Sequence, residues 1–165
     1  MAKFVFILFS AFVFSASAKN LSSHVHGLVR LEMAYEKNEL LIMLSSPAES
    51  FLGFEYKAKT KKELELLTQV KKDWKKDIIK LFGEKTLNDC KISSTNWEQK
   101  FSGERHSSIH AEAYIKCKKL LAGRNLEVTL KRHYNNIETI NLQLIRNDGT
   151  VDSRKVSEEL FTIKL

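Results

Sequence analysis

The sequence is poor in the residues that build several familiar functional motifs: it has two cysteines, one proline and six glycines in 165 residues. The sequence contains no G-x-S-x-G nucleophile elbow and no glycine-rich loop that could bind a phosphate. It also contains no H-E-x-x-H zinc motif. Cys90 and Cys117 are too far apart for a C-x-x-C redox or zinc motif. The sequence therefore gives little reason to expect an enzyme, and we expect a binding protein.

A long hydrophobic run occurs only at the start of the chain. Lys3 precedes an apolar block over residues 4–14, and Ala16-Ser17-Ala18 has the A-x-A form of a cleavage site. This pattern predicts a secretory signal peptide over residues 1–18 and one mature domain over residues 19–165. No cysteine near the cleavage site could accept a lipid, and no later stretch is apolar enough to cross a membrane. We therefore expect an exported, soluble mature chain.

The two cysteines have two interpretations in an exported protein. An even count in an oxidising compartment favours one structural disulfide between Cys90 and Cys117, closing a loop of 27 residues. Two thiolate ligands for zinc are the less favoured alternative.

The net charge of +7 comes mainly from lysines that alternate with acidic residues. An exported chain rarely meets nucleic acid, so we expect no nucleic-acid partner and favour a solvated cationic surface. Attraction to an anionic cell envelope is the functional alternative.

Periodicity predicts one α+β domain in which a mainly antiparallel sheet packs against one long helix. Residues 28–35 alternate as a half-buried strand and pair through a turn with an apolar strand at 40–44, which looks buried on both faces and ends at Pro47. A capping box at Thr60 and Glu63 starts the helix, which we expect to continue to Gly83. Its apolar stripe is read as core rather than as a partner-binding face. Further strands are predicted at 90–97, 109–117, 126–130, 140–145 and 160–165.

Histidines supply the candidate metal ligands. His24 and His26 lie on one side of any extended segment, and so do His110 and Glu112, because side chains two residues apart point the same way. Three imidazoles and a carboxylate suit a tetrahedral zinc ion. Two polar residues at a strand entrance remain the alternative for His24 and His26. His106 lies in a nearby polar loop as an accessory candidate, and His133 is expected to be solvated.

The order of motifs along the chain resembles the ZrgA family of periplasmic zinc-binding proteins, which is associated with zinc acquisition in Gram-negative bacteria. The matching elements are His24-x-His26-Gly27 after a signal peptide, Ser46-Pro47-Ala48 before Gly53-Phe54-Glu55, a cysteine after the helix, and a His-Ala-Glu strand that ends at Cys117. The resemblance implies a zinc site made of His24, His26, His110 and Glu112, with Glu55 as a nearby or outer-shell ligand.

Two positions depart from the family pattern. Members commonly carry a histidine directly after Gly-Phe-Glu, where this chain has Tyr56. Many also contain a histidine-rich insertion before the His-Ala-Glu strand, whereas residues 98–110 offer only His106 and His110. We therefore expect a single ordered zinc site without weak multi-ion capacity.

These observations give two functional hypotheses. The first is a periplasmic zinc-binding protein that captures or buffers zinc and supports an uptake system in the envelope. The second is a module that binds no metal and docks on an envelope component through its sheet or lysine-rich helix. The sequence leaves open whether copper or nickel competes with zinc, and what the oligomeric state is.

Overall fold

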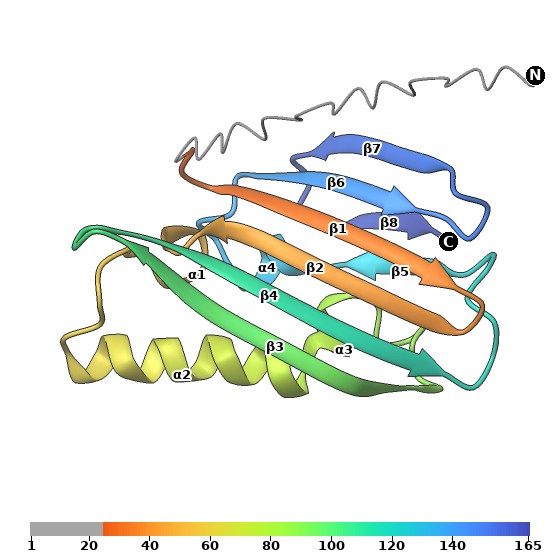
Figure 1. The fold of residues 1–165 in the computed structure, drawn as a ribbon, viewed down its shortest axis with the longest axis horizontal. Helices are drawn as coiled ribbons and strands as arrows, with labels where there is room; N and C mark the ends of the chain where they lie inside the picture. Colours follow the sequence, from red (N-terminus) through yellow and green to blue (C-terminus); the bar gives the residue numbers. More distant parts are fainter. Residues whose placement is uncertain (1–24) are drawn as a thin grey trace, which may run out of the picture.

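The computed structural model describes residues 25–165, so the expected signal peptide and His24 lie outside the described residues. The described part forms eight strands and four helices (Figure 1). In chain order these are β1 (Leu28–Glu36), β2 (Glu39–Pro47), α1 (Glu49–Leu52), α2 (Lys61–Lys76), α3 (Ile78–Leu81), β3 (Cys90–Ser102), β4 (His106–Cys117), β5 (Asn125–Val128), α4 (Leu130–His133), β6 (Thr139–Ile145), β7 (Val151–Val156) and β8 (Phe161–Lys164).

Six of the strands form one open sheet in the order β3-β4-β2-β1-β6-β7. All its pairs are antiparallel except β1 with β6, which run parallel. Strands β5 and β8 make a separate two-stranded antiparallel sheet. The described chain is thus mostly strand, with helices against one face of the large sheet, which matches the coarse form of the α+β prediction.

Alternation along β1 and β2 decides which side chains enter the core. Val29, Leu31 and Met33 are fully buried on the inner face, while Arg30 and Glu32 are exposed on the outer face. The prediction that the second strand is buried on both faces was wrong, because its outer-face residues, such as Leu41 and Met43, are only half-buried. The outer face of the sheet is therefore an accessible surface.

The helical region begins as predicted and ends differently. Thr60 caps α2, its side chain accepts a hydrogen bond from Glu63 N, and the Glu63 carboxylate accepts one from Thr60 N. One long helix to Gly83 was wrong, because α2 ends at Lys76 and α3 begins at Ile78. Asp77 lies between them with φ −113° and pairs with Lys80 at 2.7 Å. Aspartate has a low helix propensity because its side chain competes for local hydrogen bonds, which explains the break.

Helix α2 packs on the inner face beside β3 and β4 (Figure 1). Val70 and Trp74 are buried, and Trp74 Nε1 donates to Glu112 O at 2.9 Å. The apolar stripe predicted as core consists of Leu64, Leu67, Val70, Trp74, Ile78 and Leu81. It packs in the core from Leu67 onward, whereas Leu64 is 50% exposed. The same helical pattern predicts that the lysines at 71, 72, 75, 76 and 80 cover the solvent side, and all five are exposed.

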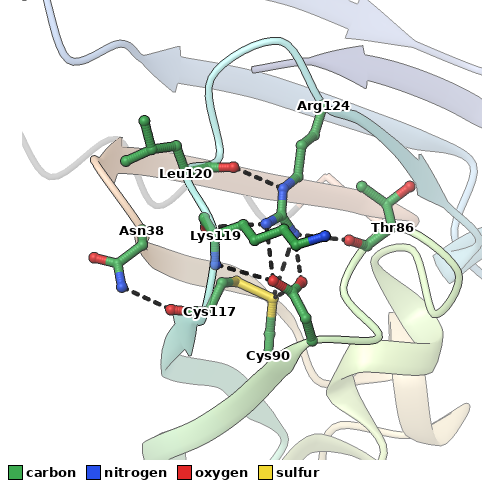
Figure 2. The surroundings of a disulfide bond; sticks show 8 residues. Asn38, Thr86, Cys90, Cys117, Lys119, Leu120 and Arg124 are labelled. Atoms are coloured by element: carbon green, nitrogen blue, oxygen red, sulfur yellow. Dashed lines mark hydrogen bonds and ion pairs between the residues drawn. A yellow bond between two sulfur atoms is a disulfide. The ribbon is translucent and has the colours of Figure 1, made fainter.

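The predicted disulfide is confirmed: Cys90 at the start of β3 is bonded to Cys117 at the end of β4. Figure 2 shows Arg124 beside this bond, with its guanidinium donating to Asp89 at 2.7 and 3.1 Å and to Thr86 O at 2.9 Å. The hydrogen bond from Arg124 is the main reason that the pKa of Asp89 falls to about 2. The alternative of zinc-binding thiolates is thereby removed, since both sulfurs are in the covalent bond.

No helix among residues 25–165 combines the length and the apolarity needed to cross a bilayer.

Candidate metal centre

The starts of β1 and β4 and the end of β2 lie together at one end of the strands, on the left in Figure 1, and this end forms one border of the six-stranded sheet. Several polar residues come from the segments at this border. His26 comes just before β1, Glu49 is the first residue of α1, and His106 is the first residue of β4. Glu55 follows α1 in the loop toward α2. The register of β2 with β4 joins Pro47 to Ser108, so the chain after β2 emerges beside the start of β4.

Hydrogen bonds and a tight turn fix the position of Glu55. Gly53 ends α1 in the left-handed conformation, with φ +76°, and its N–H donates to Glu49 O at 2.8 Å. This turn sends the chain back toward β4, where the buried Ser107 hydroxyl donates to Glu55 O. Ala48 N in turn donates to Ser107 O at 2.9 Å. Glu49 and Glu55 are therefore held by the same short segment.

His26 is positioned by the glycine that follows it. Gly27 adopts φ +70°, a conformation that disfavours other residues, and a Cβ built on it would lie 2.6 Å from Glu138 Cγ. Its carbonyl accepts hydrogen bonds from Glu138 N at 2.8 Å and Thr139 N at 3.1 Å. The backbone just before β1 is thus hydrogen-bonded to the segment at the start of β6, and this fixes the backbone position next to His26.

His26, Glu49 and Glu55 each offer one ligand atom, and these three atoms lie within 4.8 Å of one another. Ligand atoms at about 2.0 to 2.2 Å from one zinc ion lie about 3.3 to 3.6 Å apart in a tetrahedron, so small side-chain rotations would close the group. His26 Nδ1 and Glu49 Oε2 are already in direct contact. The side chains of His26 and Glu49 are 65% and 38% exposed, whereas that of Glu55 is 7% exposed.

The two carboxylate oxygens of Glu55 have different surroundings. Oε2 lies 2.7 Å from His106 Nδ1. Oε1 is buried and has no hydrogen-bond partner among the described residues. A buried oxygen of this kind is costly unless something pairs with it, and a bound cation would supply the missing partner. An imidazole and two carboxylates are donors that zinc accepts readily. We call His26, Glu49 and Glu55 the edge site.

A family model described as "ZrgA family zinc uptake protein" matches residues 23–165, almost the whole of the chain. The chain belongs to the ZrgA family. No curated protein matches it. The residues of the edge site all lie within the part of the chain that matches the family model. The resemblance to the ZrgA family that the sequence motifs indicated is confirmed.

The ligands expected from the ZrgA resemblance are distributed over two places. His24 lies outside the described residues. His26 belongs to the edge site, and Glu55 and His106, expected as accessory residues, contact each other there. The structure does not bring His110 and Glu112 to the edge site. His110 is paired with Ser45, and Ser45 with Arg30, which is four residues, about 13 Å of strand, beyond His26.

His110 and Glu112 lie on the outer face of the sheet, along a row of polar residues. His110 Nε2 is 3.0 Å from Ser108 Oγ. Burial and the nearby charge of Lys100 lower the pKa of His110, against a smaller opposing effect of Glu98.

Glu49 is the ligand candidate that sequence reasoning missed. It directly follows Ser46-Pro47-Ala48, a motif used for the resemblance, but no periodicity marks it as functional. Its proximity to His26 arises from a helical turn after β2, a relationship that strand spacing does not reveal. A second group, formed by Asp89 with the two cysteines, has its sulfurs in the disulfide and its carboxylate on Arg124.

Proposed function

We propose that this ZrgA-family protein is a periplasmic zinc-binding protein that captures or buffers zinc at the edge site and supports its uptake. The observation that carries the proposal is the buried Glu55 carboxylate: one of its oxygens lies within 4.8 Å of ligand atoms of His26 and Glu49, and its Oε1 has no hydrogen-bond partner among residues 25–165. The family's description as a zinc uptake protein supports zinc as the cargo.

Each residue of the edge site has a proposed role. His26, Glu49 and Glu55 bind the ion. His24, which the ZrgA resemblance implies as a zinc ligand and which lies outside the described residues, would be the fourth. His106 is a positioning residue: its contact with Oε2 holds the Glu55 carboxylate in one orientation, leaving Oε1 for the metal. Two carboxylates and two neutral imidazoles would leave zinc electrically neutral and fully surrounded.

The accessibility of the site supports transfer of the ion rather than permanent storage. Glu55 forms the buried floor, but His26 and Glu49 are open to solvent, so a recipient protein could reach the ion from that side. The proposed role is therefore binding without catalysis, with zinc as cargo for an envelope uptake system. The disulfide and the expected signal peptide support a periplasmic location, because disulfides persist in oxidising compartments.

A calorimetric titration of the metal-free, oxidised protein with zinc chloride tests this proposal. We expect a saturable step that the His26→Ala variant loses or weakens by about 100-fold or more. His133→Ala is the matched control, because His133 is an exposed histidine on α4 and should leave the step unchanged. Copper and nickel titrations then establish the order of affinities, since imidazole sites often prefer copper.

Acidification provides a second readout of the same site. Imidazole must be neutral to bind a metal, so the zinc affinity should fall between about pH 7 and pH 5. An affinity that is unchanged at pH 5 would exclude histidine ligation. Absence of any zinc step would instead favour the module that docks on the envelope without metal.

A further inference from the structure

The loop between α1 and α2 leads directly from the edge site into a basic surface. Glu55 is followed by residues 56–64, which contain four lysines and one acidic residue, Glu63. This loop and the start of α2 lie at the same end of the molecule as the starts of β1 and β4, on the left in Figure 1. The exposed lysines and large apolar side chains of this segment are called the basic patch: Tyr56, Lys57, Lys59, Lys61, Lys62 and Leu64.

The acidic residue of this segment is already engaged in local contacts. Glu63 Oε1 accepts a hydrogen bond from Tyr56 Oη at 2.7 Å, and Oε2 accepts from Lys59 N at 2.8 Å and from Thr60 N at 2.9 Å. The only ion pair of a patch lysine among the described residues joins Lys61 to Glu65 at 3.9 Å, with the lysine side chain 91% exposed. So long and exposed a pair holds its partners loosely. The lysines therefore present positive charge to the solvent.

Ring contacts and the helix cap hold the basic patch in one shape. The ring centroids of Phe54 and Tyr56 are 5.2 Å apart, and Lys59 Nζ lies 5.6 Å from the Tyr56 centroid. The capping box fixes the first turn of α2 beside them. Tyr56 is 37% exposed and Leu64 is 50% exposed, so both offer apolar surface between the lysines. An aromatic side chain that is ordered before binding loses little entropy when a partner packs on it.

We propose that the basic patch docks an acidic segment of the protein that receives zinc from the edge site. The inference rests on the proposed function and adds the chemistry of the recipient. Charge complementarity calls for carboxylates on the partner, because opposite charges steer two proteins together and fix their orientation. Position calls for the recipient, because Tyr56 directly follows the buried ligand Glu55. A partner held there is next to the site whose other ligands, His26 and Glu49, are open to solvent.

The directions of the lysines favour a protein segment over a flat bilayer. Lys57 and Lys59 lie in the loop, whereas Lys61 and Lys62 are the first two residues of α2. Successive residues of an α-helix point about 100° apart, so the two helical lysines leave the helix in different directions. An acidic chain can follow such a curved surface, whereas a flat bilayer meets only part of it.

Fluorescence anisotropy with the metal-free, oxidised protein tests the inference. The probe is a labelled peptide of about twelve aspartates and glutamates around a central leucine, in about 50 mM salt, where screening is weak. We expect saturable binding that Lys57→Glu/Lys62→Glu weakens by about tenfold or more. Lys118→Glu/Lys119→Glu is the matched control, because it makes the same charge change at exposed lysines just after Cys117, at the far end of β4. It should stay within about threefold of wild type.

The apolar part of the basic patch has a test of its own. Tyr56→Ala should weaken peptide binding by about threefold or more, because it removes the ring from the contact surface. Tyr56→Phe keeps the ring and loses only the hydrogen bond to Glu63, so it should bind more tightly than Tyr56→Ala. Equal binding by wild type and Tyr56→Ala would contradict a packed contact on this ring.

Vesicles of phosphatidylglycerol separate a protein partner from a bilayer. Cosedimentation with vesicles that depends on Lys57 and Lys62, without peptide binding, would overturn the proposal in favour of membrane docking. Equal weakening of peptide binding in the two double variants would also overturn it, because net charge alone would then explain the association. Absence of peptide binding would overturn it as well.

A parallel zinc titration separates this inference from the proposed function. The peptide measurement contains no zinc, so its failure beside an intact zinc step overturns the docking inference alone. Lys57→Glu/Lys62→Glu should retain the zinc step, because neither lysine is a ligand of the edge site. Loss of the zinc step with patch-dependent peptide binding would contradict the zinc cargo while supporting an acidic partner.

Discussion

Glu55 Oε2 lies 2.7 Å from His106 Nδ1, although the two residues are 51 positions apart in the chain. This contact joins the loop after α1 to the first residue of β4, and it leaves the other oxygen of the carboxylate buried without a partner among the described residues. The carboxylate is therefore both fixed in orientation and incompletely satisfied. A metal ion at the edge site would complete its coordination.

Glu55→Gln tests the importance of this carboxylate. The amide keeps the size of the side chain but removes the negative charge that holds a cation, so we expect the zinc affinity to fall by about 100-fold or more. Competition with a chromophoric chelator measures the change. Glu65→Gln, an exposed glutamate of α2, is the control and should bind zinc as the wild type does. Equal affinities for the two variants would exclude Glu55 as a ligand.

Gly27→Ala should disturb the edge site through the backbone. Alanine at φ +70° costs about 1 to 2 kcal/mol, and its Cβ would also collide with the Glu138 side chain at 2.6 Å. We expect both a lower free energy of unfolding and weaker zinc binding. Gly103→Ala is a matched control, because Gly103 has φ +73° with nothing within 4 Å of the added Cβ. It should lose stability only, and identical zinc affinities in both variants would contradict a role for Gly27 in placing His26.

Removal of the disulfide should lower stability but spare zinc binding. The bond closes a 27-residue loop, so the double variant Cys90→Ala/Cys117→Ala should lose about 3 to 4 kcal/mol in the chain-entropy description, measured by urea unfolding. Cys117 is at the opposite end of β4 from His106, so the zinc affinity of the folded variant should stay within about threefold of wild type. Loss of zinc binding by the folded double variant would show that the disulfide positions the edge site.

The ion pair of Asp89 with Arg124 should make the free energy of unfolding depend on pH in the acidic range. The pKa of Asp89 is about 2 in the folded protein and 3.8 as its ordinary value, so its stabilising contribution is present above about pH 4 and is lost as the pH falls toward 2. Asp89→Asn should therefore be less stable than wild type at pH 7, with a smaller difference at pH 2. Urea unfolding across this range measures the effect, with Asp152→Asn, at an exposed ion pair, as the control. A constant difference from pH 7 to pH 2 would contradict it.

Local patterns predicted much of the fold. Alternation in residues 28–35 and the capping box at Thr60 each depend on neighbouring residues, and both were confirmed. The parallel pairing of β1 with β6 and the strand β7 were not predicted. The former depends on contacts between segments more than 100 residues apart, and β7 has mostly exposed polar residues that give no apolar period.

The candidate site was predictable only in part for a related reason. A spacing of two residues shows that His110 and Glu112 lie on the same face of a strand. It does not show which residues of the neighbouring strands lie opposite them. The strand register decides this, and it puts His110 opposite Ser45 and not next to the start of β1. Glu49 reached the edge site through the helical turn of α1, which no metal-ligand spacing in the sequence indicates.

The most direct test of the central claim is anomalous diffraction measured at the zinc X-ray absorption edge. It uses crystals of the protein loaded with one equivalent of zinc. The account predicts an anomalous peak at about 2.0 to 2.2 Å from ligand atoms of His26, Glu49 and Glu55. A peak at any other place, or a first equivalent bound at His110, would contradict the assignment of the edge site as the zinc site of this protein.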